Sequence, residues 1–147
     1  MVRRARWGYR ARPMTALRIG SSLLLLLAAT VNASAAPPYD GTKPMQCAIE
    51  TVMVCSDPSV CVRGTAQTVN LPSVLNVDVE KKLISGAATG RTIKIAWVNR
   101  QSGRLLVGGS ELGGGWTMAV AEDTGVMSSA VIVRAGGFIL FGNCTSS

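Results

Sequence analysis

The sequence contains no histidine among its 147 residues. Histidine is the most frequent general base near neutral pH and the most frequent nitrogen ligand of metal ions. Its absence excludes a Ser-His-Asp triad and any metal site built on imidazoles. The few carboxylates form no spaced pair that indicates acid–base catalysis. The sequence therefore predicts no catalytic residue, no metal site and no cofactor.

The longest apolar run lies near the N-terminus and has the layout of an export signal. Residues 14–36 combine an arginine, an apolar segment over residues 19–31 and a small-residue A-S-A motif. A membrane-spanning helix needs about 20 apolar residues, and this segment is shorter. We therefore expect cleavage between Ala35 and Ala36 rather than a retained membrane anchor, and a protein that is periplasmic or secreted.

Cleavage at this point would change the charge of the chain. The whole sequence has 15 basic and 8 acidic residues and a formal net charge of +7. Residues 1–35 hold six of the arginines and no acid, so nine basic and eight acidic residues remain, a net charge of +1. A nearly neutral chain with scattered charges does not predict nucleic acid as a partner. We expect a cleaved signal over residues 1–35, a flexible Pro- and Gly-rich segment over 36–44 and one β domain over 45–147, with no membrane span after cleavage.

All four cysteines lie in the predicted β domain, and they lack the spacing of a metal or redox site. The closest pair, Cys55 and Cys61, has five intervening residues, whereas zinc sites and C-x-x-C motifs use shorter spacings. An even number of cysteines in a small exported domain predicts disulfides. Three pairings are open. We favour Cys55 with Cys61, which closes the turn at residues 56–59, and Cys47 with Cys144, which joins the first and last predicted strands.

Short segments of β-favouring residues follow one another at close spacing, separated by Gly-, Pro-, Asn- and Asp-containing turns. Residues 74–79 alternate apolar and polar side chains, as a half-buried strand does. Residues 92–99 predict a strand with Ile93, Ile95 and Trp97 on one face. Residues 45–55 predict a strand with every odd-numbered side chain on one face.

About nine such strands and no convincing amphipathic helix predict an all-β fold. The regular spacing is typical of a small antiparallel meander, either a barrel or a sandwich, with two disulfides. We favour a barrel because a bridge between Cys47 and Cys144 would bring the first and last strands together and remove the exposed sheet edges.

Four residues are candidate contacts to a partner. Arg100 and Arg104, together with Arg91, flank loops on either side of one strand and predict a small basic rim. Gly114 lies in the run Gly113-Gly114-Gly115, which resembles a phosphate loop in composition but opens a strand at Trp116 instead of a helix. We expect this run to be a mobile binding loop. Both Trp97 and Trp116 are in phase with apolar neighbours, which also predicts that they pack in the core.

Two families resemble this chain. The export signal, the Cys-x₇-Cys-x₅-Cys spacing, the LNVDVEKKLISG segment, a Trp-led strand and a terminal FGNC resemble small exported β proteins of proteobacteria with no assigned function. Ser102-Gly103-Arg104 followed by Trp116 resembles the serine-glycine loop and later tryptophan of periplasmic inhibitors of C-type lysozyme, which are disulfide-linked β-barrels. The first resemblance implies a compartment and not an activity, and the second implies a disulfide-linked β-barrel. We expect the partner to be an unidentified protein or small ligand.

The tripeptide Asp123-Thr124-Gly125 resembles the catalytic signature of retroviral-type aspartic proteases, in which each subunit of a dimer supplies one aspartate. The match covers three residues, and the same tripeptide is typical of a hairpin turn with a left-handed glycine. Our principal interpretation is a non-enzymatic binding or inhibitor module. The alternative is a structural, envelope-associated protein, and a homodimeric aspartic protease that uses Asp123 is a third hypothesis.

Overall fold

The computed structural model describes residues 38–57 and 60–146. Within these residues the chain forms ten strands and one short 3-10 helix, which confirms the all-β prediction with one strand more than expected. The expected leader, residues 1–35, and its cleavage site at Ala35 and Ala36 lie outside the described residues. In the part that the structure describes, no helix is long and apolar enough to span a membrane.

The elements follow one another in the chain with short connections. They are β1 (Met45–Asp57), β2 (Val60–Gly64), η1 (Ala66–Val69), β3 (Val74–Asp78), β4 (Leu83–Gly86), β5 (Thr92–Lys94), β6 (Trp97–Gln101), β7 (Arg104–Glu111), β8 (Gly114–Ala121), β9 (Val126–Val133) and β10 (Gly136–Ser146).

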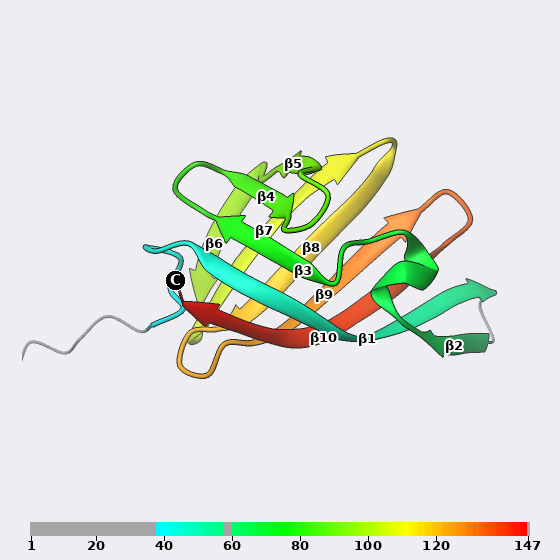
Figure 1. Ribbon diagram of the computed structural model, residues 1–147, viewed down its shortest axis with the longest axis horizontal. Helices are drawn as coiled ribbons and strands as arrows, with labels where there is room; N and C mark the ends of the chain where they lie inside the picture. Colours follow the sequence, from blue (N-terminus) through cyan, green and yellow to red (C-terminus); the bar gives the residue numbers. More distant parts are fainter. Residues whose placement is uncertain (1–37, 58–59, 147) are drawn as a thin grey trace, which may run out of the picture. The chain divides into compact units, whose positions relative to one another are not determined.

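All ten strands belong to one antiparallel sheet, which curls into a half-barrel (Figure 1). The order across the sheet is β5-β4-β3-β1-β10-β9-β8-β7-β6, and β2 also pairs with β1. The long strand β1 pairs with β10 from Met45 to Cys55. On its other side, the first part of β1 pairs with β3 and the second part with β2. The outermost strands of the path, β5 and β6, are consecutive in the chain.

The two sides of the curled sheet meet at the connection between β5 and β6. The backbone N–H of Ile95 donates to the carbonyl of Lys82, which precedes β4, at 2.9 Å. The N–H of the next residue, Ala96, donates to the carbonyl of Gly108 in β7 at 2.8 Å. Two successive residues therefore join the first and last parts of the sheet. The sequence favoured a barrel, and the structure shows a half-barrel whose two sides are connected at this point.

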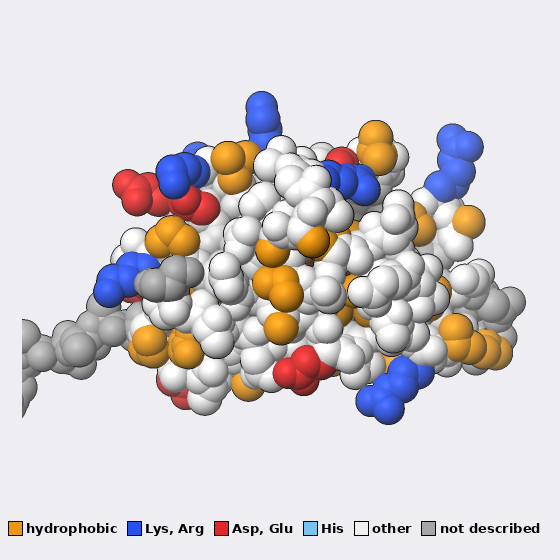
Figure 2. All heavy atoms as spheres, viewed as in Figure 1, with side chains coloured by type: hydrophobic (Ala, Val, Ile, Leu, Met, Phe, Trp, Pro, Cys, Tyr) orange, Lys and Arg blue, Asp and Glu red, His pale blue; other side chains and the backbone are white. Residues whose placement is uncertain are grey.

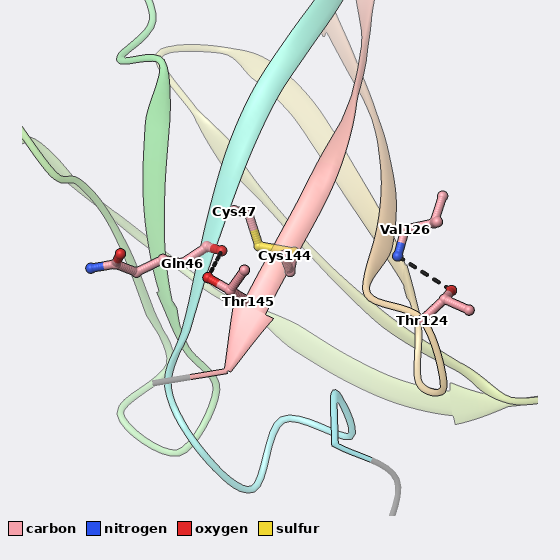
Figure 3. The surroundings of a disulfide bond; sticks show 6 residues. All are labelled: Gln46, Cys47, Thr124, Val126, Cys144 and Thr145. Atoms are coloured by element: carbon pink, nitrogen blue, oxygen red, sulfur yellow. Dashed lines mark hydrogen bonds between the residues drawn. A yellow bond between two sulfur atoms is a disulfide. The ribbon is translucent and has the colours of Figure 1, made fainter.

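Both favoured disulfides are present. Cys47 and Cys144 are directly opposite one another in the β1–β10 pair, and both side chains are buried (Figure 3). Cys55 and Cys61 are directly opposite in the β1–β2 pair. No described cysteine is free. Two disulfides in a small protein indicate an oxidising environment outside the cytoplasm.

The core fills the concave side of the sheet with aliphatic and sulfur-containing side chains. Alternation puts every second side chain of a strand on this side, as the buried Leu75 and Val77 of β3 show. Its buried members are Met45, Cys47, Leu75, Val77, Val79, Ile84, Ile95, Leu105, Val107, Met118, Val120, Met127 and Cys144.

For two predicted strands, the assignment of side chains to the inner and outer face is wrong, because each strand is interrupted by an irregularity. In β1 the register shifts between Ile49 and Thr51, so Cys47 and Ile49 face inward whereas Val52 is the buried residue beyond the bulge. Such a bulge adds a residue to one strand and exchanges its faces. The predicted strand over residues 92–99 is two strands, and the break at the sheet junction turns Trp97 to the outer face, where it is 46% exposed.

The glycine-rich run is not a loop, contrary to the sequence-based expectation. Gly114 and Gly115 begin β8, and Gly113 belongs to the two-residue turn Leu112-Gly113 that connects β7 with β8, in which both residues have positive φ. This is the geometry of a type I′ hairpin turn, which matches the twist of the strands. A Cβ atom on Gly108 would overlap the indole of Trp97, so glycine is required there for close packing of the side chain.

Candidate functional site

A cavity of about 250 Å³ lies at the end of the half-barrel where β9 ends and β10 begins. It is enclosed by the segment after η1, the start of β5, the β7–β8 hairpin and the β9–β10 hairpin, which lie at the same end of the sheet in Figure 1. The residues that line it are Val69, Asn70, Leu71, Arg91, Ile93, Glu111, Leu112, Gly114, Gly115, Trp116, Val131, Val133, Arg134 and Phe138.

The interior of the cavity is apolar because strand alternation directs its side chains inward. Trp116, Val131 and Phe138 lie at alternating positions of β8, β9 and β10 that continue the concave face of the sheet. Trp116 also packs against the buried core, so it forms the boundary between core and cavity. Its indole Nε1 is buried and has no hydrogen-bond partner among the described residues. Most indole N–H groups that are buried have a partner, so this donor is unusual.

Three ionisable side chains line the cavity. Arg91 and Glu111 form an ion pair, with Nη2 3.0 Å from Oε1, that connects the start of β5 with the end of β7 across the open side of the half-barrel. Arg134, in the β9–β10 turn, is exposed and has no hydrogen bond or ion pair within the described residues. Because Glu111 is paired with Arg91, the charge of the cavity wall that remains uncompensated is positive.

The four predicted binding residues divide between the two ends of β7. Gly114 and Trp116 line the cavity. Arg104 lies at the other end of this strand, where it lines a more open and more polar cavity of about 350 Å³ between the β6–β7 and β8–β9 turns. Arg100 donates from Nε to the backbone carbonyl of Asp40 at 2.8 Å, so it holds the segment before β1. Arg100 and Arg104 therefore do not form one site with Gly114 and Trp116.

Sequence patterns gave no signal for Arg134 and Phe138, and they placed Arg91 in a basic rim with Arg100 and Arg104 and not beside Trp116. Arg91 is far from Arg134 and Phe138 in the chain. Only the curl of the sheet and its two hairpins bring them to one cavity. On the face shown in Figure 2, lysine and arginine side chains project at separate places.

The segment before β1 is attached to the sheet. The carboxylate of Asp40 accepts hydrogen bonds from the backbone N–H of Thr42 at 2.9 Å and from its hydroxyl at 2.6 Å. These bonds, assisted by the nearby charge of Arg100, hold the pKa of Asp40 below its ordinary value of 3.8. Tyr39 adds a backbone hydrogen bond to the carbonyl of Glu122 at 3.1 Å.

The Asp-Thr-Gly motif is the turn between β8 and β9. Asp123 is exposed, and the hydroxyl of Thr124 accepts a 3.5 Å hydrogen bond from the N–H of Val126 (Figure 3). Gly125 has a φ of +75° and is buried against the last strand, where its carbonyl accepts from the N–H of Cys144 at 2.8 Å. The aspartate thus lies on the outside of a hairpin that the glycine positions.

Within residues 38–57 and 60–146, no three His, Cys, Asp or Glu side chains come together in a way that could hold a metal ion. Comparison with protein-family models, with curated proteins and with solved structures finds no match for this chain.

Proposed function

We propose that the protein is an exported, non-enzymatic binding module and that its ligand occupies the cavity at the open end of the half-barrel. The observation that carries this proposal is the cavity itself, which four separate parts of the chain enclose and whose inner wall is formed by side chains on the concave face of the sheet. The leader-like sequence and the two disulfides support a location in the periplasm or in the secreted fraction.

The construction of the cavity suits a small molecule. Ligand sites are concave, mostly apolar and furnished with a few polar groups that orient the ligand. Trp116, Val131 and Phe138 provide apolar surface on strands, and Arg91 and Arg134 provide hydrogen-bond donors at the rim. Side chains on strands are held by the sheet, so binding would need little rearrangement of the backbone.

A pair of variants on one strand tests the location of the site. Val131→Phe places a larger side chain into the cavity, whereas Ile132→Phe makes a similar change at the next residue, which is 68% exposed on the outer face. The oxidised, exported protein is mixed with a small-molecule extract of the cell envelope and of the culture medium. The shift of the thermal unfolding midpoint and the mass spectrum of retained compounds are then measured.

The proposal predicts that the wild-type protein and Ile132→Phe are stabilised and retain the same compound, because a ligand that binds only the folded state raises the unfolding midpoint. Val131→Phe should fold but lose both effects. If Val131→Phe retains the compound as well as Ile132→Phe does, the cavity is not the site. If the partner proves to be a protein, as for an inhibitor, capture that is unaffected by Val131→Phe would contradict the proposal equally.

A structural role in the cell envelope is the second candidate, and one observation favours it. Strands β8, β9 and β10 contain no charged residue, and their outer face exposes Ile132, Ile139 and Phe141 by 68%, 40% and 44%. Exposed apolar patches often mark interaction surfaces. An envelope component should sediment with the envelope fraction, and Ile132→Ser with Phe141→Ser should release it. Release by Val131→Phe instead would favour the cavity.

A further inference from the structure

We propose that the ligand of the cavity is a small molecule with an apolar body and one carboxylate, and that Arg134 binds the carboxylate. This inference rests on the proposed function, because it assigns a chemical class to the ligand of the same cavity. It follows from the charges at the rim, the apolar interior and the volume of the cavity.

The rim of the cavity favours an anion. Among its lining residues only Arg91, Glu111 and Arg134 are charged. Arg91 already has a carboxylate partner in Glu111 at 3.0 Å, whereas Arg134 has no described partner. Its guanidinium presents several N–H donors in a plane that matches the two oxygens of a carboxylate. A cationic ligand would find only Glu111, and it would have to displace Arg91.

The inner wall favours an uncharged, apolar body. Val131, Val133, Phe138, Ile93 and Trp116 contribute aliphatic and aromatic surface. Burial of an ionised group among such side chains is unfavourable without a partner, so the carboxylate has to remain at the rim. A molecule that enters with its apolar end first meets Trp116 at the inner end and Arg134 at the entrance.

The volume limits the size of the ligand. About 250 Å³ is slightly less than the range of about 300–1,000 Å³ that is typical of pockets for drug-sized molecules. A single medium-length acyl chain fits this description, whereas a two-chain lipid would leave one chain outside. Octanoate is therefore a suitable probe, with octanol and octylamine as matched molecules of nearly the same shape and different charge.

The test is isothermal titration calorimetry of the oxidised, exported protein with each of the three probes. Wild-type protein should bind octanoate most tightly, octanol about tenfold more weakly and octylamine more weakly still, because octanoate alone gains a charge-assisted pair with Arg134. Arg134→Gln should weaken octanoate to the level of octanol and leave octanol unchanged. Arg104→Gln is the control, because it makes the same change at an arginine that does not line this cavity. This variant should bind octanoate like the wild-type protein.

The outcomes separate this inference from the proposed function. Equal binding of octanoate and octanol, lost in Val131→Phe, would keep the cavity as the site and overturn the carboxylate. Preference for octanoate that survives Arg134→Gln would overturn the role of Arg134. Failure of all three probes to bind the wild-type protein would overturn the inference, while a different compound retained from the envelope extract would still support the proposed function.

Discussion

At the scale of single residues, some positions of the sheet have no room for a Cβ atom and require glycine. Gly142 of β10 faces the β1 bulge, and a Cβ atom there would overlap the carbonyl oxygen of Ala48. Gly115 of β8, in contrast, has no atom within 4 Å of the position that a Cβ would take. The two glycines are therefore required to very different degrees, although both lie in strands near apolar neighbours.

Gly142→Ala should lower the free energy of unfolding by about 1–3 kcal/mol, the usual cost of an overpacked interior. Gly115→Ala should leave it unchanged or raise it by about 0.4–1 kcal/mol, because alanine restricts the unfolded chain more than glycine does. Urea denaturation of the two variants measures both changes. Equal effects at the two positions would show that the β1–β10 contact is looser than the structure has it.

The carboxylates of Asp40 and Asp78 make the free energy of unfolding depend on pH in the acidic range. The pKa of Asp78 is lowered, chiefly by a hydrogen bond from Lys81 at 2.7 Å, and that of Asp40 by hydrogen bonds from Thr42. Their contribution is therefore present above the ordinary pKa of 3.8 and is lost as the pH falls through the lower pKa of the folded state. The hydrogen bond with Asp78 raises the pKa of Lys81. The contribution of Lys81 to stability is therefore present below its ordinary pKa of 10.5 and is lost as the pH rises above that value.

The chain has no histidine, so the unfolding midpoint should change little between pH 5 and pH 8 and fall below about pH 4. Thermal melts across this range measure the profile. Asp40→Asn and Asp78→Asn together should reduce the fall at acidic pH. A clear transition between pH 6 and pH 7 would contradict the account.

At the scale of the elements, alternation in the sequence predicted strands well but predicted their faces only where a strand is regular. Strand β3 has the predicted alternation, with Leu75 and Val77 buried. The β1 bulge and the break between β5 and β6 each exchange the two faces, and neither has a Gly or Pro in the sequence to mark it. Both irregularities arise from pairing with distant strands, so local patterns could not predict them.

The candidate site was predictable to a similar extent. Gly114 and Trp116 were expected in a binding region and line the cavity, while the cysteine pairs that are present are the favoured one of three pairings that the sequence left open. Arg91 was expected in a basic rim with Arg100 and Arg104, but its place beside Arg134 came only from the structure, since the curl of the sheet brings residues 43 positions apart to one rim. Their roles depend on tertiary proximity, which composition and periodicity do not contain.

The junction between β5 and β6 gives a prediction about backbone dynamics. The amides of Ile95 and Ala96 donate to carbonyls of Lys82 and Gly108 although they lie between two strands. Their hydrogen exchange, followed by NMR, should be much slower than in an unfolded chain. Ala96→Pro should remove the bond to Gly108 and accelerate exchange at Ile95. Unprotected amides at both positions in the wild-type protein would mean that the half-barrel is open here.

For the whole molecule, the two disulfides should differ in importance. Cys47 and Cys144 are 97 residues apart in sequence and buried, whereas Cys55 and Cys61 are 6 apart. In the chain-entropy description, a loop of about 100 residues gives about 4.7 kcal/mol of stability and a very short loop roughly half as much. The bridge from β1 to β10 is therefore expected to stabilise the fold most.

Replacement of both Cys47 and Cys144 by alanine should thus lower the free energy of unfolding by roughly twice as much as replacement of Cys55 and Cys61. Denaturation in urea of the two double variants measures the difference. A larger loss from the Cys55–Cys61 pair would indicate that the β1–β2 hairpin, and not the β1–β10 pair, determines the stability of the sheet.

The central claim is that the cavity at the open end of the half-barrel is the ligand site, and the indole N–H signals of Trp116 and Trp97 test it directly. Trp116 borders the cavity, and Trp97 lies on the outer face over Gly108. In two-dimensional ¹H–¹⁵N NMR spectra, with assignment from Trp97→Phe, added octanoate should shift the Trp116 signal to saturation and leave that of Trp97 in place. A saturable shift of Trp97 alone, or an unchanged Trp116 signal while octanoate binds, would contradict the claim.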